Sequence, residues 1–275
     1  MIRVIMVRLD GTPGDKFRLG ACESLAKLFD AHVVGLFLNI LPEPTLEDTG
    51  TTVEFWTRAL DEARERGKMM QAEFTNRLRD MARSFECRRF DVYAHEQARI
   101  TARECRTADV FVGLRLTDET LERRDVVEEV LFQSGRHLFL VADRKPFEHG
   151  FEHAVIAWNR SREAARAVTE ALPYLLVSRQ VTVVMIQQRG TPEFPPEQEE
   201  ELVGYLDHHG IRASINIMNE GRFDTTSTLL QVVREQNADL VVLGGYGHSR
   251  LREWLLGGVT YKFLRQSPVP LVIAH

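Results

Sequence analysis

The chain has 275 residues, of which 44% are apolar and 27% charged, the balance of a soluble globular protein with a sizeable core. Its formal net charge of −5 gives no electrostatic reason to expect nucleic acid or a membrane surface as a partner. No apolar run approaches the roughly 20 residues that span a bilayer, and the first residues lead directly into a strand pattern rather than a signal peptide. Cys22, Cys87 and Cys105 show no C-x-x-C spacing, which is typical of free thiols in a reducing compartment. We therefore expect a cytoplasmic protein with two domains of ordinary size.

The first half of the chain alternates strand patterns with helix patterns. Helical spacing of apolar residues predicts a helix that contains Leu19 to Phe29, and a long charged helix over 54–84. Such alternation is typical of a parallel sheet with helices on both faces. Short apolar runs predict strands at 3–9, 32–38, 91–95, 110–113 and 138–142, and further helices are predicted at 101–107 and 126–134.

A polar stretch at 143–152 separates this half from a second one in which the order starts again. We place the domains at 1–145 and 152–275. Ser161 is a good N-cap for a helix over 161–176, and Pro173 is a point where this helix can end or kink early. The second half has predicted strands at 154–158, 180–186, 213–218, 240–243 and 271–274, and further helices at 197–208 and 226–236.

The two halves are an internal repeat at a separation of roughly 130–150 residues, long enough for each copy to be a domain. The match is best at the ends of the copies, where residues 133–142 lie over 266–274. Residues 107–113 likewise resemble 237–244. The last strands of the two copies are edge strands in need of hydrogen-bond partners. We therefore expect 138–142 and 271–274 to pair within one chain as an intramolecular pseudo-dimer, which leaves a further homodimer open.

A glycine-rich motif over 239–260 is the most informative stretch of the chain. The apolar run 240–243 predicts a strand buried on both faces, and a glycine turn, a second glycine pair and a helix follow it. Glycines let backbone N–H groups approach an anion closely, and the helix after Gly258 presents its N-terminus to the same place. The motif therefore predicts an anion site. It is neither a P-loop nor a dinucleotide fingerprint, because the required glycines and lysine are absent.

With this motif and the repeat, the chain resembles the universal stress protein family, as a tandem member. Gly244, Gly247 and Gly257 fit the family signature G-x2-G-x9-G, and residues 267–273 resemble the family's last strand. The resemblance implies an α/β fold of two tandem domains, each a five-stranded parallel sheet flanked by helices. It also implies binding of ATP or a related adenine nucleotide, with or without Mg²⁺, in the second domain.

By this resemblance, Gly244 and Gly247 line the ribose and phosphate loop, while the residues from Gly257 to Thr260 offer backbone N–H groups and a hydroxyl to the phosphates. Arg250 reaches the phosphates if the loop folds over them. Asn159 stands where the family often has an aspartate, and Gly258 where it has a serine or threonine, so we expect weakened binding. The candidate binding residues are Ala157, Asn159, Ile186, Gly244, Gly247, His248, Arg250, Gly257, Gly258, Val259 and Thr260.

The first half lacks the corresponding glycines. Arg124 and Asp125 fall where the second half has Gly257 and Gly258, and 114–125 contains no glycine. A carboxylate would then face the phosphate position, and Cβ atoms would prevent close backbone approach. We therefore expect the first domain to bind no nucleotide and to act as a structural or regulatory partner of the second.

These observations favour a stress-response protein that binds ATP, ADP or AMP in its C-terminal domain, with a regulatory rather than a catalytic role. We expect no enzyme, because no general base or metal-binding carboxylate set is placed by the sequence; any ATP hydrolysis would be slow. The alternative is a nucleotide-free interaction or chaperone-like module that presents a pseudo-dimer surface to a protein or a small apolar ligand. A protein partner is expected in both cases, of unknown identity. The histidine pairs His149/His153 and His208/His209 are interpreted as solvated rather than metal-binding.

Overall fold

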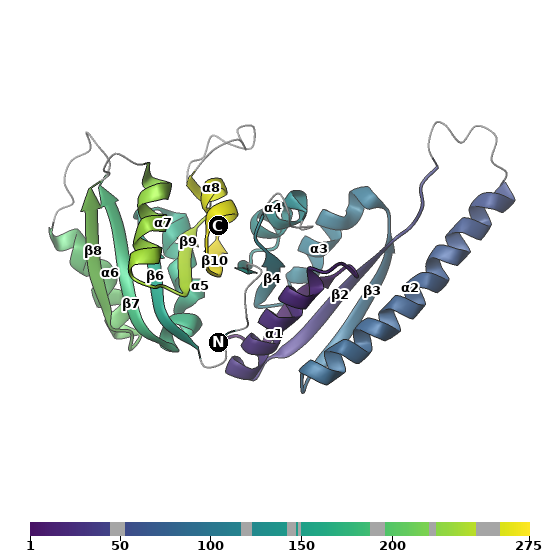
Figure 1. Ribbon diagram of the computed structural model, residues 1–275, viewed down its shortest axis with the longest axis horizontal. Helices are drawn as coiled ribbons and strands as arrows, with labels where there is room; N and C mark the ends of the chain where they lie inside the picture. The colour runs from purple at the N-terminus through teal and green to yellow at the C-terminus, as the bar shows by residue number, and fades with distance from the viewer. Residues whose placement is uncertain are drawn as a thin grey trace.

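The computed structural model describes residues 1–44, 53–116, 123–141, 147, 150–187, 196–219, 224–245 and 259–275. Two α/β halves lie side by side, each with strands covered by helices (Figure 1). The first half contains β1 (Val4–Leu9), α1 (Asp15–Phe29), β2 (His32–Ile40), α2 (Val53–Met81), β3 (Phe85–Val92), η1 (Ala94–Glu96), α3 (Gln97–Cys105), β4 (Val110–Leu114), α4 (Arg124–Gln133) and β5 (His137–Val141). The second half contains β6 (Phe151–Ala157), α5 (Arg162–Leu176), β7 (Ser178–Gln187), α6 (Pro196–His208), β8 (Ala213–Asn219), α7 (Thr225–Glu235), β9 (Leu240–Gly244), α8 (Val259–Gln266) and β10 (Leu271–Ala274).

The described strands form one ten-stranded sheet in the order β3-β2-β1-β4-β5-β10-β9-β6-β7-β8. Each half supplies five strands that run parallel to one another, and the halves join where β5 pairs antiparallel with β10. Leu140 lies opposite Leu271, and Leu138 opposite Ile273. Both strands are buried along their whole length, so their apolar side chains as well as their backbones need a partner. The expected α/β fold and the pairing of the two last strands within one chain are thus confirmed.

Matching contacts occur in the two halves of the chain. The Asp109 carboxylate accepts the backbone N–H groups of Arg3 at 2.7 Å and Val4 at 2.9 Å. The Asp239 carboxylate accepts those of the corresponding pair on β6, the second of which is His153, at 2.8 and 3.0 Å. Val4 therefore corresponds to His153, and β1 and β4 correspond to β6 and β9.

The loops after β1 and β6 also match. Gly11 and Arg160 both adopt the left-handed backbone conformation, with φ of 76° and 62°. They occupy the same step of the loop, two residues after the end of β1 and three after the end of β6. Asp10 therefore corresponds to Asn159, as the alignment of the two strands requires.

One expectation about the elements is wrong. The strand expected at 91–95 is β3, which pairs with β2 over eight residues from Phe85 to Val92. It is an edge strand with four charged side chains, so no apolar pattern reveals it. Helix α5 continues through Pro173 to Leu176, which confirms the predicted end of this helix, and the fully buried Tyr174 lies in its last turn.

No helix in the described part of the chain combines the length and apolar character needed to cross a membrane.

Candidate functional site

Each half has a point where the strand order reverses, between β1 and β4 in the first and between β6 and β9 in the second. In open α/β sheets, ligands bind outside the carboxyl ends of the strands at such a switch point. The strands whose carboxyl ends form these two points are β1 and β4 in the first half and β6 and β9 in the second. The two switch points are therefore equivalent candidate sites, and they differ in what their own side chains place there.

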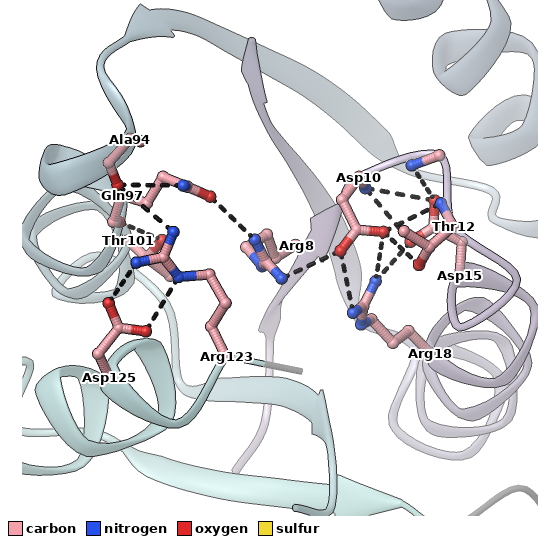
Figure 2. Close-up of polar contacts among 11 residues, drawn as sticks. Arg8, Asp10, Thr12, Asp15, Arg18, Ala94, Gln97, Thr101, Arg123 and Asp125 are labelled. Carbon is pink, nitrogen blue, oxygen red and sulfur yellow. Dashed lines mark hydrogen bonds and ion pairs between the residues drawn. The ribbon is translucent and has the colours of Figure 1, made fainter. Parts of the chain in front are cut away.

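At the first switch point, buried ion pairs occupy the loop after β1 (Figure 2). The Arg18 side chain is 0% exposed and donates to Asp10 at 3.1 Å and to Asp15 at 2.6 Å. Arg8, on β1, donates to the same Asp10 carboxylate at 3.0 Å, and the Thr12 hydroxyl does so at 2.6 Å. Two guanidinium groups and two carboxylates thus balance one another inside the protein.

The two carboxylates are held in different ways. Burial alone would raise the pKa of Asp10, but the charge and hydrogen bonds of Arg18, together with Arg8, outweigh it and lower that pKa. Burial and the neighbouring Asp10 charge raise the pKa of Asp15 instead. Asp15 also accepts the backbone N–H of Gly11 at 2.8 Å, so it fixes the loop. The network is a structural centre with a balanced internal charge.

The start of α4 supplies a further carboxylate to this edge (Figure 2). Asp125 lies in the first turn of α4 and pairs with Arg123 at 3.0 and 2.6 Å. The hydrogen bond from Arg123 is the main reason why the pKa of Asp125 is lowered. Between α4 and β1, Gln97 accepts from Arg8 at 3.4 Å. A helix N-terminus favours an anion, and here the chain's own carboxylate is placed in its first turn.

The second switch point carries none of these charges at the matching positions. When the strands and loops of the two halves are matched, alanines stand in the second half where the first half has Arg8, Asp15 and Arg18. Of these, Ala164 and Ala167 are 2% and 1% exposed, and Ala157 is partly exposed at the end of β6. Arg8, Asp10, Asp15 and Arg18 correspond to Ala157, Asn159, Ala164 and Ala167.

The loop between β6 and α5 is ordered by its own polar groups. The side-chain carbonyl of Asn159 accepts the backbone N–H of Ser161 at 3.1 Å, and the Ser161 hydroxyl accepts that of Ala164 at 3.1 Å. Ser161 is thus the N-cap of α5, as predicted. Arg160, whose backbone is in the left-handed conformation, forms an ion pair with Glu201 of α6 at 3.2 Å. Asn159 keeps an amide N–H₂ group as the donor that this loop can offer to a ligand.

Gly244, the first glycine of the motif, has a packing role that sequence reasoning missed. A Cβ at this position would lie 2.5 Å from the backbone nitrogen of Ala164 and 2.8 Å from the carbonyl carbon of Glu163. In the equivalent helix–strand contact of the first half, the strand β4 carries the large Leu114 and the small residue is Gly14, directly before α1. A Cβ on Gly14 would lie 2.7 Å from the Leu114 side chain. The small residue sits on the strand in one half and on the helix in the other.

The remaining candidates are placed only in part. Ile186 lies on β7 with a partly buried side chain and pairs with Met218 of β8. Val259 and Thr260 begin α8, so the helix starts directly after the second glycine pair, as expected. Gly247, His248, Arg250, Gly257 and Gly258 lie outside the described residues.

His153 is not the solvated histidine that the sequence suggested. It is 7% exposed and lies on β6, where its Nε2 is 2.8 Å from the Thr182 hydroxyl. Its Nδ1 lies 3.0 Å from the backbone carbonyl of Gln236 and donates to it. His153 therefore links the first residues of β6 to the end of α7. Within the described residues, no group of three or more histidine, cysteine or acidic side chains is arranged to hold a metal.

These features define a class: a two-part α/β protein with two equivalent candidate sites, of which the first contains the ion pairs of Arg8 and Arg18 and the second has alanines at the matching positions. Residues 150–275 match the universal stress protein family. A universal stress protein from Archaeoglobus fulgidus DSM 4304 has a TM-score of 0.73 at 16% identity, over 98% of this chain and 95% of that one. A functionally unknown protein from Pseudomonas aeruginosa PAO1 has a TM-score of 0.64 at 12% identity, over 99% and 92%. No curated protein sequence matches the chain significantly.

A third similar structure, described as a putative universal stress protein from Pseudomonas aeruginosa UCBPP-PA14, has a TM-score of 0.60 at 12% identity, over 99% of this chain and 93% of that one. The second half of the chain therefore belongs to the universal stress protein family, and the first half shares the fold.

Proposed function

We propose that the second half binds an adenine nucleotide (ATP, ADP or AMP) at the β6/β9 switch point, and that occupancy has a regulatory rather than a catalytic role. The observation that carries this proposal is the difference in charge between the two switch points. Arg8, Asp15 and Arg18, which form ion pairs in the first half, are replaced by alanines in the second.

Nucleotide phosphates are polyanions, so a carboxylate at their position opposes binding. The first switch point is occupied by the ion pairs of Arg8 and Arg18, and the Asp125 carboxylate lies in the first turn of α4. The second offers the amide of Asn159 and the N-terminal turn of α8, whose backbone N–H groups and dipole favour an anion. This supports a nucleotide with its phosphates at α8 and its nucleoside near the loop after β6, as the family resemblance implies.

In this proposal the first half binds no nucleotide and the second half signals its occupancy to a protein partner of unknown identity. Mg²⁺ accompanies the nucleotide as its phosphate complex, if at all. For nucleotide occupancy to have a regulatory effect, the protein must have two conformations, and the nucleotide must bind one of them more tightly than the other.

Isothermal titration of the full chain with ATP, with and without Mg²⁺, tests the proposal. We expect one site per chain. Gly247→Glu places a carboxylate in the glycine motif and should abolish binding. The matched control is Gly204→Glu, because a side chain at Gly204 on α6 would meet nothing within 4 Å. Neither heat nor a thermal shift at millimolar ATP for the wild-type chain would contradict the proposal.

A further inference from the structure

Helix α4 of the first half contacts the second half at two places, around Gly245 after β9 and at Tyr261 in α8. Resting on the proposed function, we infer that α4 is a positioning element for the nucleotide site of the other half. Arg124 would set the orientation of α8, and Leu131 and Phe132 would fix the end of β9. The first half would then contribute to nucleotide affinity without binding nucleotide itself.

The first set of contacts involves Gly245, directly after β9. Its backbone N–H donates to the Ala274 carbonyl at 2.8 Å, and a Cβ on it would lie 3.1 Å from the Leu131 side chain. Its carbonyl accepts from His275 Nδ1 at 2.9 Å, and the His275 ring packs edge-on against Phe132 at 4.8 Å. Leu131 and Phe132 belong to the last turn of α4. The end of β9 and the C-terminal residue His275 thus pack against α4 of the first half.

The second set of contacts involves Tyr261, in the first turn of α8. The guanidinium of Arg124 lies 4.7 Å from the centre of the Tyr261 ring, and that of Arg265 lies 5.8 Å from it. Arg124 is held in this direction by Glu128, at 2.6 Å. The far end of α8 is also tied to the first half, because Arg115 donates to the Arg265 carbonyl at 2.5 Å.

One face of α4 makes both sets of contacts. Arg124, Glu128 and Leu131 follow the i, i+4, i+7 spacing that places side chains on one side of a helix. Arg124 and Leu131 are therefore separated by about 10 Å along the helix axis. A rigid helix of the first half thus spans the distance between the end of β9 and the start of α8.

This arrangement matters for binding because backbone N–H groups hold an anion well only when they are fixed in place beforehand. If α8 is free to rotate, ordering it reduces the nucleotide affinity. Its contact with α4 also makes nucleotide occupancy and the packing of the two halves mutually dependent, since coupling between two sites is reciprocal. The first half, filled by its own ion pairs, would serve as the fixed frame.

The test compares Arg124→Ala with Arg124→Lys and with Arg123→Ala. Arg123 is the matched control, because it is the adjacent arginine and its pair, Asp125, lies within the first half. Two readouts are used: the dissociation constant for ATP by titration, and the hydrogen exchange of α8 amides without nucleotide. For Arg124→Ala we expect a five- to tenfold weaker affinity and about fivefold faster exchange in α8. Arg124→Lys should fall between, and Arg123→Ala should match the wild type in both.

Tyr261→Leu removes the other partner of the contact. It should reproduce the effect of Arg124→Ala, and the double variant should add little to either one, because they remove the same interaction. Unchanged affinity and unchanged α8 exchange in Arg124→Ala would overturn the inference, as would additive effects in the double variant. If the wild type binds no ATP, the proposed function fails, whereas the exchange of α8 still decides whether α4 positions this helix.

Discussion

The contact between Gly244 and the start of α5 allows a sharp test of the packing that brings β9 to the switch point. In Gly244→Ala, the added methyl group would lie 2.5 Å from the nitrogen and 2.9 Å from the Cα of Ala164. These are backbone atoms, which cannot turn away as the end of a flexible side chain can. Helix α5 would have to move away from β9 by about 1 Å to reach ordinary van der Waals separation.

Overpacking of this kind costs about 1–3 kcal/mol. Because a methyl group at Gly244 meets three backbone atoms below 3.0 Å, we expect the upper part of this range, about 2–3 kcal/mol. For a chain of this size that corresponds to a fall in Tm of about 4–10 °C. Urea unfolding followed by circular dichroism measures the free energy directly, and a thermal scan measures the fall in Tm.

The control is the same substitution at Gly204, which lies within α6 with nothing within 4 Å of an added methyl group. Gly204→Ala should stabilise the protein by about 0.5–1 kcal/mol, because alanine favours a helix interior. The two variants should therefore shift the unfolding midpoint in opposite directions. If Gly244→Ala unfolds within about 0.5 kcal/mol of the wild type, the close packing of α5 on β9 is refuted.

Three further predictions concern the buried polar groups. Asp10→Asn should destabilise the chain by about 3 kcal/mol at pH 7 in urea unfolding, because it leaves Arg18 without one of its carboxylates; a loss below about 1 kcal/mol would show that the network is not structural. Tyr174→Phe should cost about 1 kcal/mol by the same assay, since it removes the 2.9 Å hydrogen bond to His137 between the halves, and a neutral result would mean that packing alone matters there. The hydrogen bond from His137 lowers the pKa of Glu170, so its stabilisation is complete above about pH 4.5 and is lost as pH falls through the folded-state pKa. Glu170→Gln should therefore lower the stability at pH 7 and flatten its decline between about pH 5 and pH 3; an unchanged acid limb would contradict this assignment.

The sequence predicts the features that depend on local pattern and repetition. The strand–helix alternation, the N-cap Ser161 and the pairing of the two last strands are all found in the structure. They are readable because continuous apolar runs and terminal strands in need of partners leave direct traces in the order of residues.

The features that the sequence does not predict depend on side-chain contacts that leave no periodic pattern in the sequence. The ion pairs of Arg8 and Arg18 form only when β1, the loop after it and α1 have their folded arrangement. The replacement of these arginines by alanines is visible only once the two halves are aligned. A histidine beside a polar linker looks solvated, and only the course of β6 turns His153 towards Thr182. The glycine motif assigns Gly244 to a ligand, although its contact with α5 already requires a glycine. An alignment of the two βα units around Asp10 and Asn159 is the signal that reveals the difference in charge.

The central claim is that one of the two equivalent switch points binds an adenine nucleotide and the other does not. Native mass spectrometry of the full chain, as purified and after addition of ATP, counts the bound nucleotides directly. We expect one nucleotide per chain, lost in Gly247→Glu and retained in Gly204→Glu. A chain that stays free of nucleotide at millimolar ATP, or one that takes up two, would contradict the claim.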